Sequence, residues 1–170
     1  MNPAIETKEL CYAYEDGTTA LDHITLSAGR GSITGILGAN GAGKSTLFLN
    51  LNGVFTPKSG QGLLDGQPVK YDRKGLAALR RRVGIVFQDP DDQLFSADVY
   101  RDVSFGGVNL GLEPEEVRRR VEEALERTGT SALRDRPTHA LSYGQKKRVA
   151  IAGVLVMEPE VLILDEPTAG

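Results

Sequence analysis

The sequence is poor in the residues that form disulfides and soft-metal sites. It holds one cysteine and two histidines in 170 residues, and no tryptophan. A single thiol, Cys11, excludes an internal disulfide and is typical of a reducing compartment. Cys11, His23 and His139 are scattered along the chain, so we expect no metal site made of soft ligands.

Long apolar runs and an excess of positive charge are also missing. The longest apolar run, Val149 to Met157, falls far short of the roughly 20 residues that span a bilayer. The first six residues lack the basic and apolar blocks of a signal peptide. A net charge of −3 gives no basic field for nucleic acid. We therefore expect one cytosolic domain over residues 1–170, with no nucleic-acid partner and with any membrane role dependent on another protein.

Glycine, by contrast, is abundant and concentrated around one stretch. An apolar run over 32–37, short enough for a buried strand, meets a glycine-rich bend over 38–43. An apolar helix follows, which Gly53 can end. The bend has the spacing G-x-x-x-x-G-K-S, which is the Walker A pattern of a phosphate loop. A flexible Gly/Ser turn is the alternative.

The residue types of this loop suit phosphate binding. Glycines let successive backbone N–H groups point at phosphate oxygens, and the helix adds its positive dipole end. Lys44 can reach the β- and γ-phosphates, Ser45 can coordinate Mg²⁺, and Thr46 can donate to phosphate. The candidate nucleotide-binding residues of the loop are Gly38, Asn40, Gly41, Gly43, Lys44, Ser45 and Thr46.

The N-terminal residues alternate as in an antiparallel hairpin. Leu10, Tyr12 and Tyr14 precede a turn at 15–17, after which the pattern resumes. Tyr14 either stacks on an adenine ring or packs on the sheet. A second hairpin is expected to turn at 65–66.

Two further strands are followed by polar residues. Gln88 follows an apolar run over 83–87, and Asp165 with Glu166 follows 161–164. Ligands bind at the carboxyl ends of strands in open α/β sheets. Asp165 is placed to hold Mg²⁺ and Glu166 to act as general base on water. Two exposed acids ending a strand are the alternative.

Helical patterns fill the region between these strands. Residues 113–129 have one apolar stripe and a charged face that is expected to be solvated. The loop over 88–95 suits either a contact surface or a mobile segment. We expect a mainly helical insert at about residues 89–138.

A short polar motif precedes the apolar helix at 149–157. It reads Leu-Ser-Tyr-Gly-Gln over 141–145, and three cations follow at 146–148. Cations in a first helical turn oppose the macrodipole unless an anion lies nearby. Ser142 is either an ordinary N-cap or part of a phosphate-binding motif.

The order of these motifs resembles the nucleotide-binding subunit of ABC transporters over nearly the whole chain. The four motifs are Walker A, Gln88, the 141–145 motif and Leu162–Thr168 (LILDEPT). The resemblance implies that Tyr14 stacks on adenine and that Gln88 links Mg²⁺ and water to the transmembrane partner. It also implies that Ser142, Gly144 and Gln145 contact ATP held by an opposing subunit.

Further segments are similar to the ATPases of energy-coupling-factor importers, most of all the branch that imports cobalt. They are 87–95, 109–112 and 145–153. The resemblance implies an ATP- and Mg²⁺-dependent ATPase with Lys44, Gln88 and Glu166 in catalysis and with Ser45, Gln88 and Asp165 at the metal. It implies a peripheral place on the cytoplasmic face of the membrane. Expected partners are a second ATPase subunit, identical or paralogous, a transmembrane coupling subunit and a substrate-capturing membrane subunit.

The resemblance also predicts more chain than is present. The family continues through another core strand and a switch histidine, whereas His139 precedes the signature motif. We therefore expect an α/β P-loop NTPase core with an N-terminal antiparallel β subdomain, incomplete at the C-terminus. The alternatives are a nucleotide-binding fragment without turnover, an importer of another metal or a vitamin, and a soluble non-transport ABC ATPase.

Overall fold

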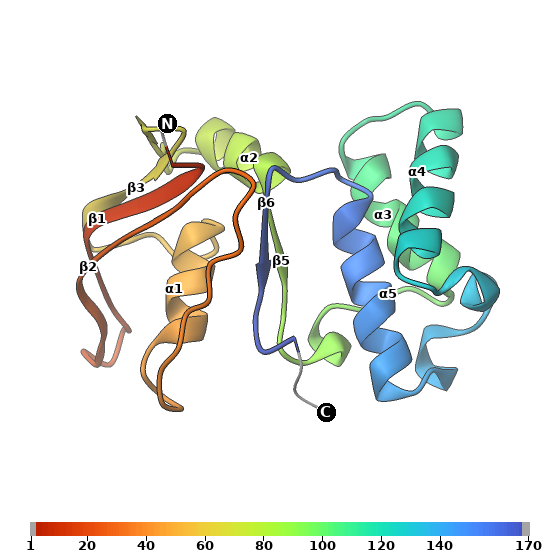
Figure 1. Cartoon of the computed structure of the whole chain (residues 1–170), viewed down its shortest axis with the longest axis horizontal. Helices are drawn as coiled ribbons and strands as arrows, with labels where there is room; N and C mark the ends of the chain where they lie inside the picture. The colour runs from red at the N-terminus through yellow and green to blue at the C-terminus, as the bar shows by residue number, and fades with distance from the viewer. Residues whose placement is uncertain (1–2, 168–170) are drawn as a thin grey trace. The chain divides into compact units, whose positions relative to one another are not determined.

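A computed structural model describes residues 3–167, which divide between Val83 and Gly84 into two compact units (Figure 1). Each unit is described by itself. None of the helices in residues 3–167 is long and apolar enough to cross a membrane.

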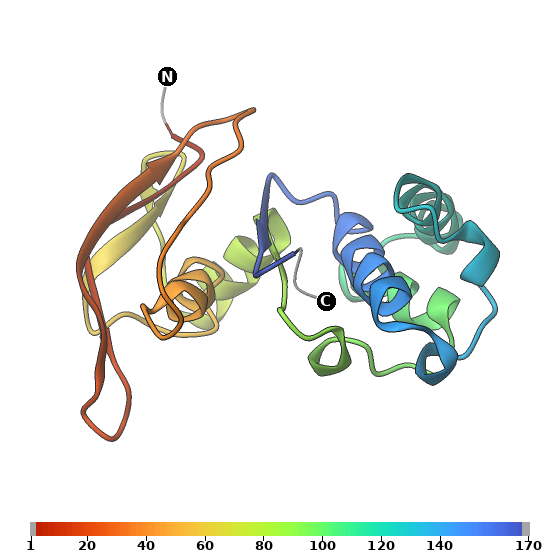
Figure 2. The same ribbon diagram turned by 60° about the horizontal axis from the view of Figure 1, so that its bottom comes forward.

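The first unit is built on an antiparallel sheet with the strand order β2-β1-β3-β4. The strands are β1 (Ile5–Ala13), β2 (Thr19–Ala28), β3 (Ser59–Leu64) and β4 (Gln67–Pro68). Both predicted hairpins are present, and Figure 2 shows the β1–β2 hairpin along its length. Leu10 and Leu21 are buried on its inner side.

A tight turn joins β3 to β4 at the predicted position. Asp65 and Gly66 have φ of 53° and 74°, the left-handed pair that a type I′ turn requires. Asp65 also binds Arg30 at 2.5 Å and Arg82, the last residue of α2 (Arg73–Arg82). These two arginines hold the pKa of Asp65 below its usual value.

Helix α1 (Lys44–Leu51) begins at the phosphate loop and ends before Gly53, as predicted. The buried strand expected over 32–37 is wrong: this segment has no strand structure, and Ile33 and Leu37 are fully exposed. A core strand needs backbone partners on its flanks, and no strand of residues 3–167 pairs with this segment. The apolar pattern is local, whereas a strand depends on its neighbours.

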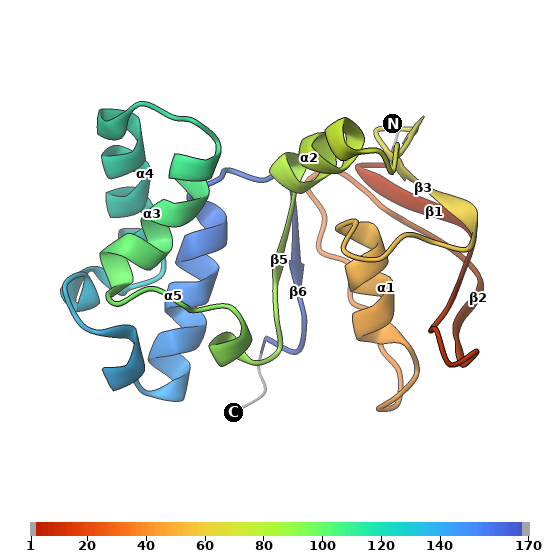
Figure 3. The ribbon, with the colours of Figure 1, turned by 180° about the vertical axis from the view of Figure 1, so that it is seen from behind.

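The second unit combines a strand pair with three helices. Strands β5 (Val83–Val86) and β6 (Val161–Leu164) run in the same direction (Figure 1). Helices α3 (Val99–Asn109), α4 (Pro114–Arg127) and α5 (Tyr143–Leu155) lie side by side in Figures 1 and 3. The remaining elements are the short 3₁₀ turns η1 (Pro90–Asp92), η2 (Ser131–Leu133) and η3 (Thr138–Ala140).

The three helices share one apolar core. Val103 of α3, Val121 of α4 and Val149 of α5 are fully buried in it. A second cluster joins α5 to the strands through Val86, Ala150 and Val154. Helix α5 is therefore the central element of this unit, because it packs against α3 and α4 in one cluster and against β5 in the other.

The outer face of α4 carries the solvated charges that its sequence predicts. Arg119 and Arg120 both bind Glu116, at 2.8 and 2.6 Å, and Arg120 also binds Glu158 beyond α5 at 3.0 Å. Hydrogen bonds from Arg119 and Arg120 lower the pKa of Glu116 from 4.5 to about 2.

The Glu116→Gln variant tests this ion network. A depressed pKa means that Glu116 stabilises the fold fully above pH 4.5 and loses this effect as the pH falls toward about 2. Urea unfolding should therefore show the variant to be less stable at pH 7, with the difference from wild type vanishing near pH 2. A constant difference across this range would contradict the assignment. Glu126→Gln, on an exposed part of the same helix, is the control.

Candidate functional site

The phosphate loop is shaped by glycine at the start of α1. Gly41 and Gly43 have φ of 81° and 89°, and Gly43 is the N-cap of α1. A Cβ on Gly43 would lie 2.5 Å from the carbonyl oxygen of Ala20. The loop therefore passes over β2 at a distance that only glycine allows, and the first N–H groups of α1 have no side-chain cap. Such N–H groups are suited to an anion.

The Lys44 side chain folds back across this loop. Its Nζ donates to the carbonyl oxygens of Gly38 at 2.8 Å and Ala39 at 3.1 Å. The ammonium group is thereby held over the bend that the sequence predicts to bind phosphates. Ser45 is the second residue of the helix and is exposed, and Asn40 lies within the exposed loop.

An aromatic group adjoins the same helix. Tyr14 packs edge-on against Tyr12 and Phe55, whose rings stack on each other with centroids 4.8 Å apart. The Tyr14 hydroxyl shares a hydrogen bond of 2.6 Å with Thr46 Oγ1. Tyr14 therefore contacts both the aromatic residues beside the sheet and the helix that follows the loop, and its side chain remains 40% exposed. Both readings of Tyr14 from the sequence stay open.

The carboxyl ends of β5 and β6 bring Gln88 and Glu166 together. Gln88 Nε2 donates to Glu166 Oε2 at 3.1 Å. The Asp165 amide donates to the Val86 carbonyl at 3.0 Å, which aligns the two strand ends. Residues 78 positions apart in the sequence thus share one edge, as expected for parallel strands.

Asp165 is more deeply buried than Glu166, the residue that follows it. It is only 7% exposed, and its Oδ1 atom is buried with no hydrogen-bond partner among residues 3–167. A buried carboxylate oxygen without a donor is costly unless a cation or another donor binds it. An oxygen ligand of this kind suits Mg²⁺.

The 141–145 motif forms a capping box at the start of α5. Ser142 Oγ accepts from the Gln145 amide at 3.3 Å, and the Gln145 side chain accepts from the Ser142 amide at 2.9 Å. The N-cap reading of Ser142 is confirmed. Gly144 leaves the surface open, because a Cβ there would meet nothing within 4 Å.

The three cations of α5 are satisfied by acceptors of the chain itself. Lys146 binds Asp91 at 2.5 Å, and Arg148 donates to the Gly129 carbonyl at 3.2 Å. Lys147 is buried and donates to the backbone carbonyls of Glu166 at 2.7 Å and Gln88 at 3.3 Å. The conflict with the helix dipole is thus relieved without a bound anion.

Sequence reasoning missed two features. The first is Lys147, which holds the backbone of Gln88 and Glu166. The available sequence signal was a lysine next to the apolar run of its helix. Cys11 and His23, expected to be scattered, lie together with Asp22 on β1 and β2. No periodic pattern signals that contact.

The structure divides the predicted site residues between the two units. Within residues 3–167, the loop residues and Tyr14 lie in the first unit. The second unit holds Gln88, Ser142–Gln145, Asp165 and Glu166. Thr168 lies outside the described range.

The family model described as "ABC transporter" matches residues 21–169. The chain therefore belongs to the ABC transporter family. The fold is correspondingly that of an ABC ATPase, with the α/β architecture that the sequence predicts.

Relatives point to one branch of this family. The chain is 63% identical over 98% of its length to the energy-coupling factor transporter ATP-binding protein EcfA3 of Clostridium perfringens, covering 58% of that protein. It is 58% identical over its full length to the cobalt import ATP-binding protein CbiO of Rhodobacter capsulatus, covering 61% of it. The solved structure of CbiO1 from Clostridium perfringens, part of the ABC transporter complex cbiONQ, matches with 61% sequence identity and a TM-score of 0.89. The match includes all of this chain and 68% of the CbiO1 chain. The chain thus spans about three fifths of the curated relatives that it matches.

Gly43→Ala tests the close approach of the loop to β2. The added Cβ meets the Ala20 carbonyl and must adopt a positive φ, so we expect a loss of at least about 1 kcal/mol in unfolding free energy. Urea denaturation measures this loss. Gly35→Ala is the matched control, because its Cβ would meet nothing within 4 Å and its φ is not positive. Equal stability of the two variants would refute the constraint.

Proposed function

We propose that the chain is the nucleotide-binding part of an ATPase subunit that powers a membrane importer of the energy-coupling-factor type, with cobalt ions as the transported substrate. The observation that carries this proposal is the loop over 38–46, in which the Lys44 ammonium binds the loop carbonyls of Gly38 and Ala39 and α1 begins without a side-chain cap among the described residues. The names of the relatives support the importer and the cobalt substrate.

In this proposal the loop binds the phosphates of ATP. Backbone N–H groups and the α1 dipole hold phosphate oxygens, while Lys44 exchanges its loop carbonyls for the β- and γ-phosphates. Thr46 donates to phosphate, and Tyr14 provides a ring face for adenine. A charged donor within reach of transferred phosphate stabilises the charge that develops there.

The acidic residues after β6 suit the metal and the water. Asp165 Oδ1, which has no partner among residues 3–167, fits a hard cation, so Asp165 and Gln88 of the second unit would hold Mg²⁺, which when bound neutralises phosphate charge. The Ser45 hydroxyl of the first unit is an oxygen ligand of the same kind. Glu166 takes the proton of the attacking water as general base. The Gln88 amide fixes the orientation of the Glu166 carboxylate, and Lys147 fixes its backbone.

The proposed partners follow from the exposed parts of the second unit. Ser142, Gly144 and Gln145 begin α5 on an open surface, which suits contact with ATP bound by a second, identical or paralogous ATPase subunit. Phe95 and Phe105 stack edge-on while staying 65% and 47% exposed, which suits a transmembrane coupling subunit. The subunit is then peripheral at the cytoplasmic face of the membrane, beside a coupling subunit and a substrate-capturing subunit.

Lys44→Ala tests the phosphate cradle. Loss of the ammonium group should weaken Mg·ATP binding by at least about tenfold, since a charged hydrogen bond contributes about 1.5–3 kcal/mol. Calorimetric titration of the 170-residue chain measures the affinity. Lys58→Ala, at an exposed lysine of the same unit, should bind like wild type. Unchanged affinity of Lys44→Ala would remove the cradle assignment.

Glu166→Gln tests the general base. Phosphate release should fall by about 10²–10⁴-fold while Mg·ATP binding persists. The Glu126→Gln variant, which changes an exposed glutamate, should keep the wild-type rate. Normal hydrolysis by Glu166→Gln would exclude Glu166 as base. Binding without release by wild type would favour the alternative of a nucleotide-binding module without turnover.

A further inference from the structure

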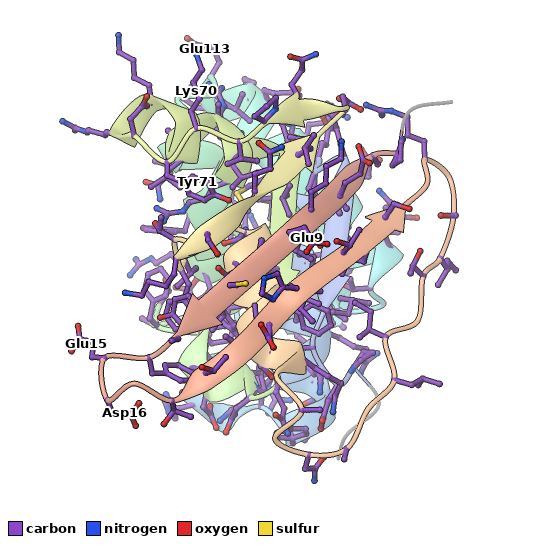
Figure 4. The ribbon with its side chains drawn as sticks, turned by 90° about the vertical axis from the view of Figure 1, so that its left-hand side faces the viewer. Glu9, Glu15, Asp16, Lys70, Tyr71 and Glu113 are labelled. Atoms are coloured by element: carbon purple, nitrogen blue, oxygen red, sulfur yellow. The ribbon has the colours of Figure 1, made fainter. Side chains whose placement is uncertain are left out.

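A cluster of metal-binding side chains lies on the hairpin of β1 and β2, apart from the residues assigned to the nucleotide. Cys11, Asp22 and His23 each offer a ligand atom, and these atoms all lie within 4.8 Å of one another. His23 Nδ1 is 2.6 Å from Asp22 Oδ1, and the His23 amide donates to Cys11 Sγ at 3.2 Å. The side chains of Asp22 and His23 are 77% and 68% exposed. Figure 4 looks onto the face of β1 and β2 that carries the labelled Glu9.

A β-bulge creates this cluster. Leu10 pairs with Ile24 and Tyr12 with Leu21, so Cys11 alone opposes both Asp22 and His23. Successive residues of a regular strand point to opposite faces, yet Asp22 and His23 are both exposed while Leu21 before them is buried. His23 has φ of 51°, a left-handed conformation that breaks the alternation. Regular alternation would point Asp22 and His23 to opposite faces of the sheet. The strained, left-handed conformation of His23 instead brings both side chains close to Cys11.

We propose that Cys11, Asp22 and His23 bind a divalent transition-metal ion of the Zn²⁺ or Co²⁺ class. The ligands are the Cys11 thiolate, a His23 ring nitrogen and an Asp22 carboxylate oxygen, with water as the fourth. Tetrahedral bonds of ~2.0–2.3 Å separate ligand atoms by ~3.3–3.8 Å, so small rotations of the exposed Asp22 and His23 side chains toward the half-buried Cys11 reach this geometry. The thiol loses its proton to solvent as the metal–sulfur bond forms, and no group is oxidised or reduced.

The ligand set determines which ions the site accepts. Thiolate and imidazole favour Zn²⁺ and Co²⁺, whereas Mg²⁺ favours oxygen ligands. The site is therefore chemically distinct from the Asp165 carboxylate, and it does not depend on the proposed ATPase function. A bound ion joins β1 to β2 and stabilises the hairpin against unfolding.

Cobalt titration of the reduced 170-residue chain tests the site. Because Cys11 is the only cysteine, a near-ultraviolet sulfur-to-cobalt charge-transfer band reports this site alone. We expect the band to saturate at one Co²⁺ per chain, to disappear when Zn²⁺ is added and to survive an excess of Mg²⁺. Absence of the band, or its loss on adding Mg²⁺, would overturn the proposal.

Variants distinguish a three-ligand site from a thiol acting alone. Cys11→Ser should abolish the cobalt band and Zn²⁺ binding by calorimetry, while His23→Gln and Asp22→Asn should each weaken Zn²⁺ binding by at least about tenfold. His139→Gln changes the other histidine and should bind like wild type. Circular dichroism confirms that each variant is folded. Unchanged affinity in both His23→Gln and Asp22→Asn would overturn the three-ligand site.

Discussion

The arrangement of the second unit depends on one buried ammonium group. Lys147 projects from α5 and donates to the backbone carbonyls that follow β5 and β6, at Gln88 and Glu166. A buried charge is tolerable only when hydrogen bonds replace its hydration, and these carbonyls do so. In return, the ammonium fixes the two strand ends at which the amide of Gln88 meets the carboxylate of Glu166. A helix whose buried side packs in two apolar clusters thereby also sets the geometry of polar side chains.

The parts of the fold that the sequence predicts are those with local causes. The turn at Asp65–Gly66, the helix ends at Gly53 and Gly129, and the capping box at Ser142 each follow from the conformational preference of a few neighbouring residues. The strand expected over 32–37 failed because a strand needs partners that local pattern cannot supply. Within the candidate site, the loop residues and the acids after β6 were predictable from spacing. Lys147 and the Cys11 cluster were not, since both depend on contacts between distant segments.

Function rests on sites rather than on the fold alone. Membership of the ABC transporter family explains why a phosphate loop, a strand-end glutamine and a pair of acids occur in this order. The structure adds the partners of these side chains: carbonyls for Lys44, an amide for Glu166 and, within the described part of the chain, none for one oxygen of Asp165. These surroundings differ in the chemistry they allow. In the function that we propose, the Lys44 ammonium binds phosphate, the Glu166 carboxylate takes a proton from water, and the buried Asp165 oxygen binds a metal ion.

The bulge in β2 also changes the edge that this strand presents to solvent. In the described sheet β2 is an outer strand, and outer strands offer unpaired backbone groups to other chains. The left-handed His23 interrupts that row, and the charged Asp22 beside it would be brought close to any strand docking there. An approaching strand thus finds neither a continuous ladder nor an apolar edge. The irregularity that gathers three side chains is thus also of the kind by which outer strands disfavour pairing with another sheet.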